Sequence, residues 1–343
     1  MTRNRIVYIA LSLVVSAVLV GVLLSQVRAQ DFGRILSGIY VPALLVYMAV
    51  SLVSTWLRAL RYKCLLAPQP ISWGNMFLVT FIRNSFEDLL PARIGSLSYI
   101  YVLNKRLGFS FESAASSFVV AFVFDFLTLY PFLIAALLAA GFSGEVFPMG
   151  ALLAAAVFFF ALFILILWKL VPLARAAVGV LRALLKALKR ENKPKVRAAL
   201  QKLGTTIQGL EDIRRRRIYG RLFFLSLVIR LGKYVSLFAL FFALLQSQGF
   251  VLADLNLWKT VLGITGAEMT SALPIKGLAD FGTWESAWVV ALRLMHFDPR
   301  LAVLSGFGIH LITNLFEYTL GLVSLLVLLV PYFLRRRNRA AGS

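Results

Sequence analysis

The fold is decided by an apolar stretch that breaks before it can cross a membrane: residues 71–95 read ISWGNMFLVTFIRNSFEDLLPARIG. A membrane-spanning helix needs about 20 mostly apolar residues, and here Glu87, Asp88 and Pro91 interrupt the run. Basic residues lie on both sides, in the loop 58–63 before the stretch and at 105–106 after it. Because Lys and Arg in short loops collect on the cytoplasmic side, the sequence predicts a re-entrant segment that enters and leaves the membrane on that side.

A second apolar stretch, residues 257–295, is broken in the same way, by the sequence LPIKGLADFG at 273–282. Both breaks read Leu-Pro, any residue, then Arg or Lys, with a Gly within the next two positions. Acidic loops flank the second stretch, with Asp254 before it and Asp298 after it, which indicates entry from the opposite face. Broken helices at matching positions of two halves are typical of an inverted-topology repeat with a transport site near the midplane. The alternative is two ordinary Pro-kinked spans without duplication.

Composition assigns the chain to the membrane class. Of its 343 residues, 60% are hydrophobic and 15% are charged, whereas a soluble domain has about 45–50% apolar and about 25% charged residues. The sequence therefore predicts an all-α polytopic membrane protein with about six full transmembrane helices and two re-entrant broken-helix hairpins. The six full spans are expected at Ile6–Leu24, Ile39–Leu57, Ser113–Ala140, Phe147–Leu170, Leu222–Leu245 and Leu301–Leu334.

The formal net charge of +21 is mainly an orientation signal. Basic residues precede the first span, fill the segment 169–221 and follow the last span at 335–339, whereas the loops 141–146 and 247–257 carry one acidic residue each and no base. This distribution predicts a multi-pass protein of the cell (inner) membrane with the N-terminus and the C-terminus in the cytoplasm. Since the bases flank spans, we expect no nucleic-acid partner.

The predicted organisation has two membrane repeats and one basic insert. The first repeat covers 1–140, with its re-entrant segment at 71–95, and the second covers 141–334, with its re-entrant segment at 257–295. The insert, 173–217, reads as two amphipathic helices that turn at 192–194, and a basic tail follows at 335–343. Such helices lie in the membrane interface, where the insert serves as an orientation anchor on anionic headgroups or as a collector of anionic lipids.

Two motifs of the first half, NSFEDLLPARIG at 84–95 and YVLNKRLG at 101–108, are similar to the flippase-like transmembrane domain of lysylphosphatidylglycerol synthases and its stand-alone relatives. Residues 273–285 of the second half add weaker support. The resemblance implies an integral membrane protein that moves lipids or lipid-linked precursors between leaflets, without a synthase domain after it. Two positions depart from the family's pattern. Phe122 replaces an Arg that commonly precedes the acidic residue of the third span, here Asp125, and His310 replaces an Arg of the last span.

Charged residues inside the apolar segments are the candidate site, because a charge at the bilayer centre costs about 2.5–3.5 kcal/mol and so needs a partner or a role. We assign substrate binding to the bases Arg83, Arg93, Arg230, Lys233 and Lys276. We assign coupling or ion pairing to Glu87, Asp125, Glu268, Asp280, Glu285, His310 and Glu317. A polar cavity between the repeats would explain all of them, and the simpler alternative is internal pairing, for example of Asp125 or Glu317 with Arg230 or Lys233.

The leading function is therefore a lipid flippase for an anionic phospholipid or a polyprenyl-phosphate-linked lipid. The alternatives are a secondary transporter of a small anion and a membrane-embedded accessory of a lipid or glycosyl transferase. We expect no enzyme activity and no cofactor or metal, because the sequence has no P-loop and no metal-ligand spacing, and its two histidines, His296 and His310, stand far apart. The expected partners are membrane lipids, and the sequence leaves open whether the chain forms a homo-oligomer.

Overall fold

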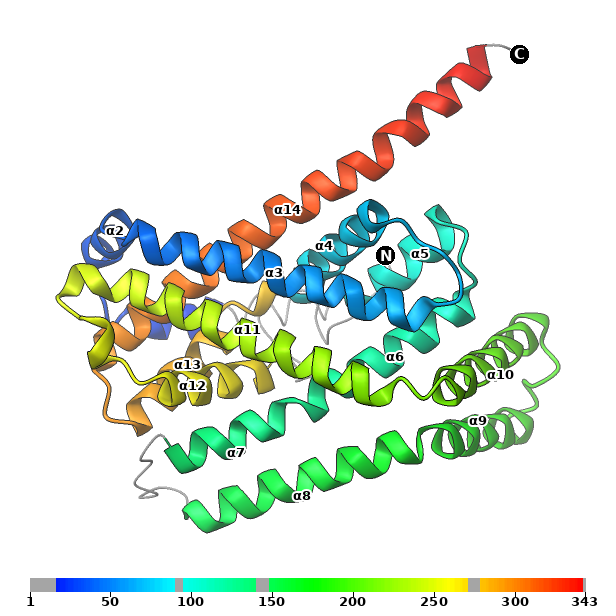
Figure 1. The fold of residues 1–343 in the computed structure, drawn as a ribbon, viewed down its shortest axis with the longest axis horizontal. Coiled ribbons are helices and arrows are strands. Elements are labelled where there is room, and N and C mark those ends of the chain that lie inside the picture. The colour runs from blue at the N-terminus through cyan, green and yellow to red at the C-terminus, as the bar shows by residue number, and fades with distance from the viewer. Residues whose placement is uncertain (1–16, 90–94, 140–147, 271–277, 342–343) are drawn as a thin grey trace.

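The protein is a bundle of long helices (Figure 1). The computed structural model describes residues 17–89, 95–139, 148–270 and 278–341, and none of these residues lies in a strand. After the initial segment, the elements are α2 (Ala29–Ser37), α3 (Val41–Leu66), α4 (Trp73–Leu89), α5 (Ser98–Arg106), α6 (Phe111–Leu127), α7 (Leu129–Ala139), α8 (Met149–Trp168), α9 (Leu170–Ala187), α10 (Pro194–Arg215), α11 (Tyr219–Leu245), η2 (Gln246–Gln248), η3 (Leu252–Asp254), α12 (Leu257–Thr270), η4 (Leu278–Asp280), α13 (Thr283–Leu294) and α14 (Pro299–Ala341).

Within the described residues, five segments are long and apolar enough to cross a membrane: Val41–Leu66, Phe111–Ala139, Met149–Trp168, Tyr219–Gln248 and Pro299–Leu328. They coincide with five of the six predicted spans, while most of the first predicted span, Ile6–Leu24, lies outside the described residues. The helix α8 exposes apolar side chains from its middle to its end, among them Phe158, Ile164 and Trp168. Such a continuous apolar surface is unfavourable in water, and it fits a helix that faces lipid.

The helices end at both predicted breaks. In the first half α4 ends at Leu89 and α5 begins at Ser98, and in the second half α12 ends at Thr270 and α13 begins at Thr283. The break residues 90–94 and 271–277 lie outside the described residues. The helices α12 and α13 pack against each other, and η4 of the second break contacts α4 of the first half. The re-entrant course, the inverted repeat and the domain boundaries drawn from it stay predictions.

The helices α3 and α11 run side by side through the bundle and connect two apolar clusters (Figure 1). The first cluster gathers around the later part of α3 with α4, α5, α6 and α10. The second gathers around the later part of α11 with α12, α13 and α14. Small residues let the two long helices approach closely, because a Cβ added at Gly232 of α11 would lie 2.3 Å from Ser54 Oγ of α3.

One prediction about α3 is wrong. The bases at 58–63 were expected in a cytoplasmic loop, but α3 continues to Leu66 and Arg61 has no exposed surface. The apolar run counted from the sequence stops at Arg58, the first charge, whereas Ala59 and Tyr62 beyond it are fully buried in the bundle. The helix therefore continues because its charges find partners inside the protein.

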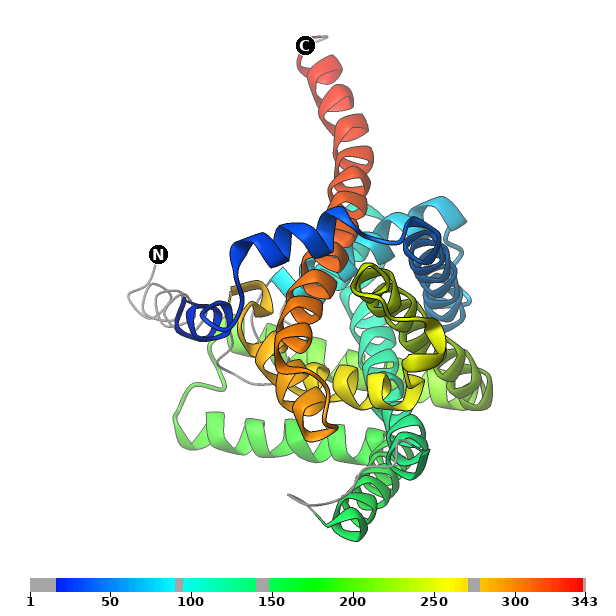
Figure 2. The ribbon, with the colours of Figure 1, turned by 90° about the vertical axis from the view of Figure 1, so that its left-hand side faces the viewer.

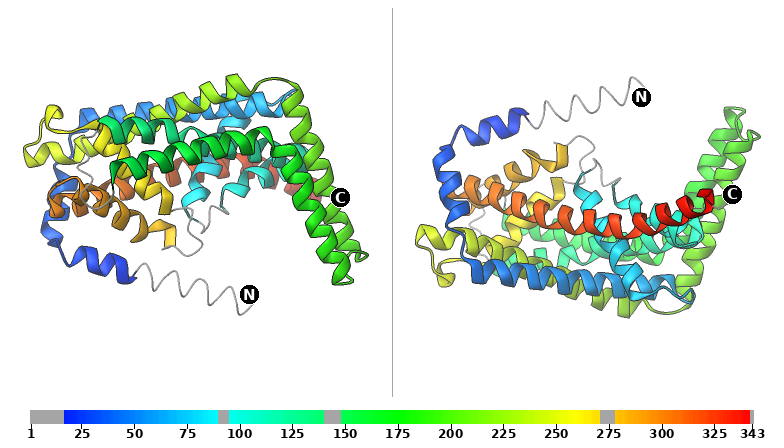
Figure 3. Two further views of the ribbon diagram at one scale, coloured as in Figure 1. Left: turned by 90° about the horizontal axis from the view of Figure 1, so that it is seen from below. Right: turned by 90° about the horizontal axis from the view of Figure 1, so that it is seen from above.

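The basic insert forms the predicted pair of helices, α9 and α10, which run across the direction of α3 and α11 (Figure 3). The helix α2 lies across the other end of the bundle (Figure 2). The helix α10 buries Leu200, Ile207 and Leu210, whereas Leu184 of α9 is 57% exposed and Leu188, directly after α9, is 64% exposed. An apolar stripe left open on a helix beside the ends of membrane spans is typical of a helix in the lipid interface.

Candidate functional site

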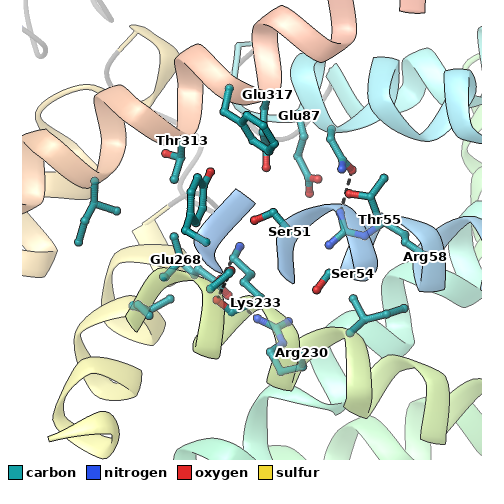
Figure 4. A pocket seen from close by; sticks show the side chains of 18 of the residues that line it. Ser51, Ser54, Thr55, Arg58, Glu87, Arg230, Lys233, Glu268, Thr313 and Glu317 are labelled. Carbon is teal, nitrogen blue, oxygen red and sulfur yellow. Dashed lines mark hydrogen bonds and ion pairs between the residues drawn. The ribbon is translucent and has the colours of Figure 1, made fainter. Parts of the chain in front are cut away.

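A polar cavity of about 170 Å³ lies between the two apolar clusters (Figure 4). Its walls come from α3, α4, α6, α11, α12, η4, α13 and α14. The cavity follows the middle of the α3 and α11 pair, where α3 contributes the polar residues Ser51, Ser54, Thr55 and Arg58. Spacings of three and four residues place side chains on one face of a helix, so this stripe turns the polar face of α3 toward the cavity.

On the α6 side of the cavity, the carboxylate of Asp125 receives the buried guanidinium of Arg61. The Arg61 Nη1 atom lies 2.6 Å from Asp125 Oδ1 and 2.8 Å from Ser226 Oγ, and Nη2 lies 3.2 Å from Asp125 Oδ2. Arg83 lies 4.0 Å from the same carboxylate and pairs with Glu87, one turn along α4, at 2.8 Å. The pattern is a charge network that spans α3, α4 and α6.

Arg58 differs from the other bases of the cavity wall. Its Nη1 donates to Asn84 Oδ1 at 2.8 Å, its Nε has no partner, and it forms no ion pair with any residue that the structure describes. The remaining wall bases pair with carboxylates: Arg83 with Glu87, and both Arg230 and Lys233 with Glu268. Arg58 therefore presents a positive charge that the protein itself leaves available for an anion.

On the α12 side, one buried carboxylate holds two bases of α11. Glu268 accepts Arg230 Nη1 at 2.5 Å and Lys233 Nζ at 2.6 Å. Arg230 is further held by the main-chain carbonyl of Asp125, at 2.5 Å from its Nη2. The side chain of Lys233 is 41% exposed, against 11% for Arg230. Figure 4 shows Lys233 and Glu268 across the cavity from Arg58 and Glu87.

A histidine–carboxylate pair closes the α13 and α14 side. His310 Nδ1 lies 2.6 Å from Glu285 Oε1, and the other carboxylate oxygen accepts the main-chain N–H of Gly282 at 2.8 Å. The imidazole stacks on Phe281 and contacts Trp284, with ring centroids at 4.5 and 5.3 Å. His310 lines the cavity, while Glu285 is fully buried behind it and orients the ring.

The structure brings most of the predicted site residues together. The cavity wall includes Arg83, Glu87, Asp125, Arg230, Lys233, Glu268, Asp280, His310 and Glu317. Glu285 stands behind the wall, and Arg93 and Lys276 lie outside the described residues. The pairing suggested for Arg230 and Lys233 is made instead by Glu268, since α11 packs against α12.

Sequence reasoning missed Arg58 and Arg61. The signal that could have found Arg58 is the polar spacing 51, 54, 55 and 58, which continues one helical face through a predicted loop. In the described part of the chain, no group of three or more His, Cys, Asp or Glu residues could hold a metal ion.

The sequence matches, over residues 9–321, the family described as the Lysylphosphatidylglycerol synthase TM region. The chain belongs to this family. Among curated proteins, none matches it. As a member of the Lysylphosphatidylglycerol synthase TM region family, the protein is a multi-pass membrane protein whose domain is associated with a lipid-related function.

The two departures from the family's charge pattern acquire a structural account. At Phe122, where the resemblance implies a base before Asp125, the base that pairs with Asp125 comes from another helix, as Arg61 of α3. His310 stands where the last span often has an arginine, and it keeps a nitrogen against a carboxylate, that of Glu285. In both places a nitrogen–carboxylate contact is present in this member of the Lysylphosphatidylglycerol synthase TM region family.

Proposed function

We propose that the protein is a lipid translocator, which moves an anionic phospholipid or a polyprenyl-phosphate-linked lipid between leaflets without a chemical reaction. The observation that carries the proposal is the polar cavity at the depth of the spanning helices, with bases and carboxylates from both halves of the chain. A headgroup enters this cavity while its tails stay in the bilayer. Membership in a lipid-associated membrane family supports the same substrate class.

The phosphate of the headgroup binds between Arg58 of α3 and Lys233 of the neighbouring helix α11, which both line the cavity. Hydrogen bonds from charged donors to phosphate are the strong ones. The carboxylates Glu87 and Glu268 hold Arg83, Arg230 and Lys233 while the site is empty. A proton on one of these acids couples a step that carries the lipid against its gradient.

Charge and membrane potential determine which energy source each direction of movement would need. An inside-negative potential favours the outward movement of an anionic headgroup by about 2.3 kcal/mol per charge per 100 mV. We place the protein in the cell (inner) membrane with both termini in the cytoplasm, as the basic loops indicate. Outward movement then needs no further energy source, whereas inward recycling of a polyprenyl phosphate needs a coupled proton.

The decisive experiment is leaflet exchange in proteoliposomes, with a fluorescent anionic phospholipid, a polyprenyl phosphate and a zwitterionic lipid as separate cargoes. Losing one charge-assisted hydrogen bond of about 1.5–3 kcal/mol should slow exchange about tenfold or more in Arg58→Gln, with partial recovery in Arg58→Lys. The matched control is Arg221→Gln, which removes an exposed base of α11 outside the cavity wall and should leave the rate unchanged.

Two outcomes would contradict the proposal. A folded preparation that exchanges none of these lipids would rule out translocation. Uptake of free inorganic phosphate into sealed vesicles, lost in Arg58→Gln and without lipid exchange, would favour the small-anion transporter, which could use the same cavity.

The inverted repeat has its own test, because single cysteines at Ala92 and Ala279, in a chain with Cys64 replaced, lie in or beside the two breaks. They should react with a membrane-impermeant thiol reagent from opposite sides. Labelling from one side alone would remove the repeat.

A further inference from the structure

A second cavity, of about 430 Å³, lies between α4, α5 and α14. Its wall is almost entirely apolar and includes Ile82 and Phe86 of α4, Val102 of α5 and Leu325 and Leu328 of α14. The polar groups in the wall belong to three side chains of α5, with Ser98 and Arg106 at the two ends of the helix and Tyr101 between them. We call this cavity the α5 groove.

The α5 groove runs inward from one end of the bundle. Arg106 is the last residue of α5, and α6 begins shortly after it at Phe111. The Phe111 ring contacts the basic insert, because the Lys202 Nζ atom of α10 lies 5.3 Å from the ring centroid. From Ser98 to Arg106 the helix has nine residues, so its ends are about 12 Å apart along the axis. Half of the hydrocarbon core of a bilayer is about 15 Å. The length of α5 is therefore close to the thickness of one leaflet, and a base stands at the end of the helix.

The inner end of the groove is set by a close backbone approach. A Cβ added at Gly95 would lie 1.4 Å from the carbonyl oxygen of Phe86, so the chain after the first break is seated directly on α4. Near this end, the hydroxyl of Ser98 is buried and has no hydrogen-bond partner. A buried polar group without a partner is costly, and an acceptor on a ligand would satisfy it.

The helix α4 separates the groove from the polar cavity. Ile82 and Phe86 line the α5 groove, whereas the neighbouring positions Arg83 and Glu87 line the polar cavity. The helix α14 is shared in the same way, with Glu317 on the cavity and Leu325 on the groove. A molecule held in the groove would therefore lie one helix away from the site proposed for the headgroup.

We propose that the α5 groove binds a phospholipid of the leaflet at which α5 ends, with one acyl chain along the apolar wall and the phosphate at Arg106. The apolar wall selects hydrocarbon, the length of α5 is close to the thickness of one leaflet, and the base lies where the headgroup begins. The Ser98 hydroxyl donates to an ester oxygen of the lipid. The role of this lipid as cargo waiting beside the polar cavity rests on the proposed function, but its binding does not.

The test compares lipid retention in the full chain, purified in mild detergent and analysed by native mass spectrometry. Leu325→Trp fills the groove, and Leu326→Trp is its matched control, because Leu326 is exposed and lies outside the wall. Each buried methylene contributes close to a fourfold factor in binding, so the displacement of two methylene groups should lower phospholipid retention about fifteenfold in Leu325→Trp. The control should retain lipid like the wild type.

A second measurement keeps the result independent of folding defects. Dioleoyl phosphatidylglycerol with a photoactivatable group in one chain should crosslink to peptides of α5 and α14 in nanodiscs, and dihexanoyl phosphatidylglycerol should not compete for the site. Arg106→Gln should reduce the retention of phosphatidylglycerol more than that of a neutral diacylglycerol. Equal retention in Leu325→Trp and Leu326→Trp, or crosslinks elsewhere alone, would overturn the proposal.

The outcomes separate this site from the proposed function. In one case, the protein retains lipid, Leu325→Trp loses it, and no lipid is exchanged between leaflets. This result supports lipid binding in the groove and contradicts the translocator function. In the opposite case, Leu325→Trp retains lipid like the wild type and leaflet exchange continues. This result contradicts lipid binding in the groove and remains consistent with the translocator.

Discussion

Asp125→Asn tests whether the buried charge network at α6 holds the helices around the cavity together. Arg61 has no exposed side-chain surface, and its guanidinium contacts both oxygens of Asp125 and the hydroxyl of Ser226. The substitution leaves this guanidinium buried without the carboxylate that it pairs with. Breaking a buried pair from one side costs about 3–5 kcal/mol, so we expect the free energy of unfolding to fall by about 4 kcal/mol.

The opposite change, Arg61→Met, should cost less because Asp125 keeps a second base. Arg83 lies 4.0 Å away, and the Asp125 side chain is 20% exposed. At an effective dielectric constant of about 20, unit charges attract by about 6 kcal/mol at the 2.6 Å of the Arg61 contact and by about 4 kcal/mol at 4.0 Å. Because the Arg83 contact is present in the wild type and stays in the variant, the Asp125 carboxylate keeps a counter-ion. We therefore expect Arg61→Met to lower the free energy of unfolding by less than Asp125→Asn, and the double variant should lie near the Arg61→Met value.

Equilibrium unfolding in mixed micelles of SDS and a mild detergent measures these differences, with size-exclusion profiles as a check that each variant is folded at the start. Glu211→Gln is the control, since it breaks the exposed pair with Arg175 and should cost under about 1 kcal/mol. If Arg61→Met is as costly as Asp125→Asn, or if the double variant equals the sum of the single ones, the two residues are not coupled as the geometry implies.

Three further changes probe the packing and the surface. Gly321→Ala would place a Cβ 1.7 Å from Ser85 Oγ, so we expect about 1–3 kcal/mol of destabilisation in the same unfolding assay, recovered when Ser85 is replaced by Gly. Gly95→Ala would set a methyl carbon 1.4 Å from a main-chain oxygen of α4, and the yield of monodisperse protein should fall sharply. Arg300 lowers the pKa of the Asp31 carboxyl through an ion pair. The stabilisation from this pair is thus fully present above the usual carboxyl pKa and is lost as the pH falls through the lowered pKa of the folded protein. Wild type and Asp31→Asn should therefore differ in thermal midpoint at pH 7 and converge once the pH lies below that lowered pKa.

The fold could be predicted to the extent that it depends on apolar length. Five spans and the two insert helices follow from runs and periodicity that a membrane imposes on any sequence. The end of α3 could not be found in this way, because a window that stops at the first charge cannot know that Arg61 has a carboxylate on α6. Long-range pairing of this kind reverses the local cost of a charge in an apolar segment, and only the packing of three helices reveals it.

The candidate site was predictable as a set of residues and not as a set of pairs. A charge in an apolar stretch stands out in the sequence by itself, which is why Asp125, Arg230, Lys233 and Glu268 could all be named. Which carboxylate meets which base depends on the neighbours of each helix. Glu268 meets both bases of α11 because α11 packs on α12, and the spacing along the chain carries no trace of that contact.

The ion pairs of the cavity wall also determine which basic side chains could contact the proposed headgroup. A base can leave its ion pair only if the buried carboxylate keeps another counter-ion. Glu268 is shared between Arg230 and Lys233, and Arg230 is held a second time by a main-chain carbonyl. Lys233 can therefore turn toward a phosphate while Glu268 keeps Arg230 as its counter-ion. The released side chain is the more exposed of the two, so its desolvation costs less. Arg58 needs no release, since its contact in the empty cavity is with the neutral amide of Asn84. Under the proposed function, an anion would thus meet one base that is already available, on α3, and one that its own ion pair can spare, on the neighbouring helix α11.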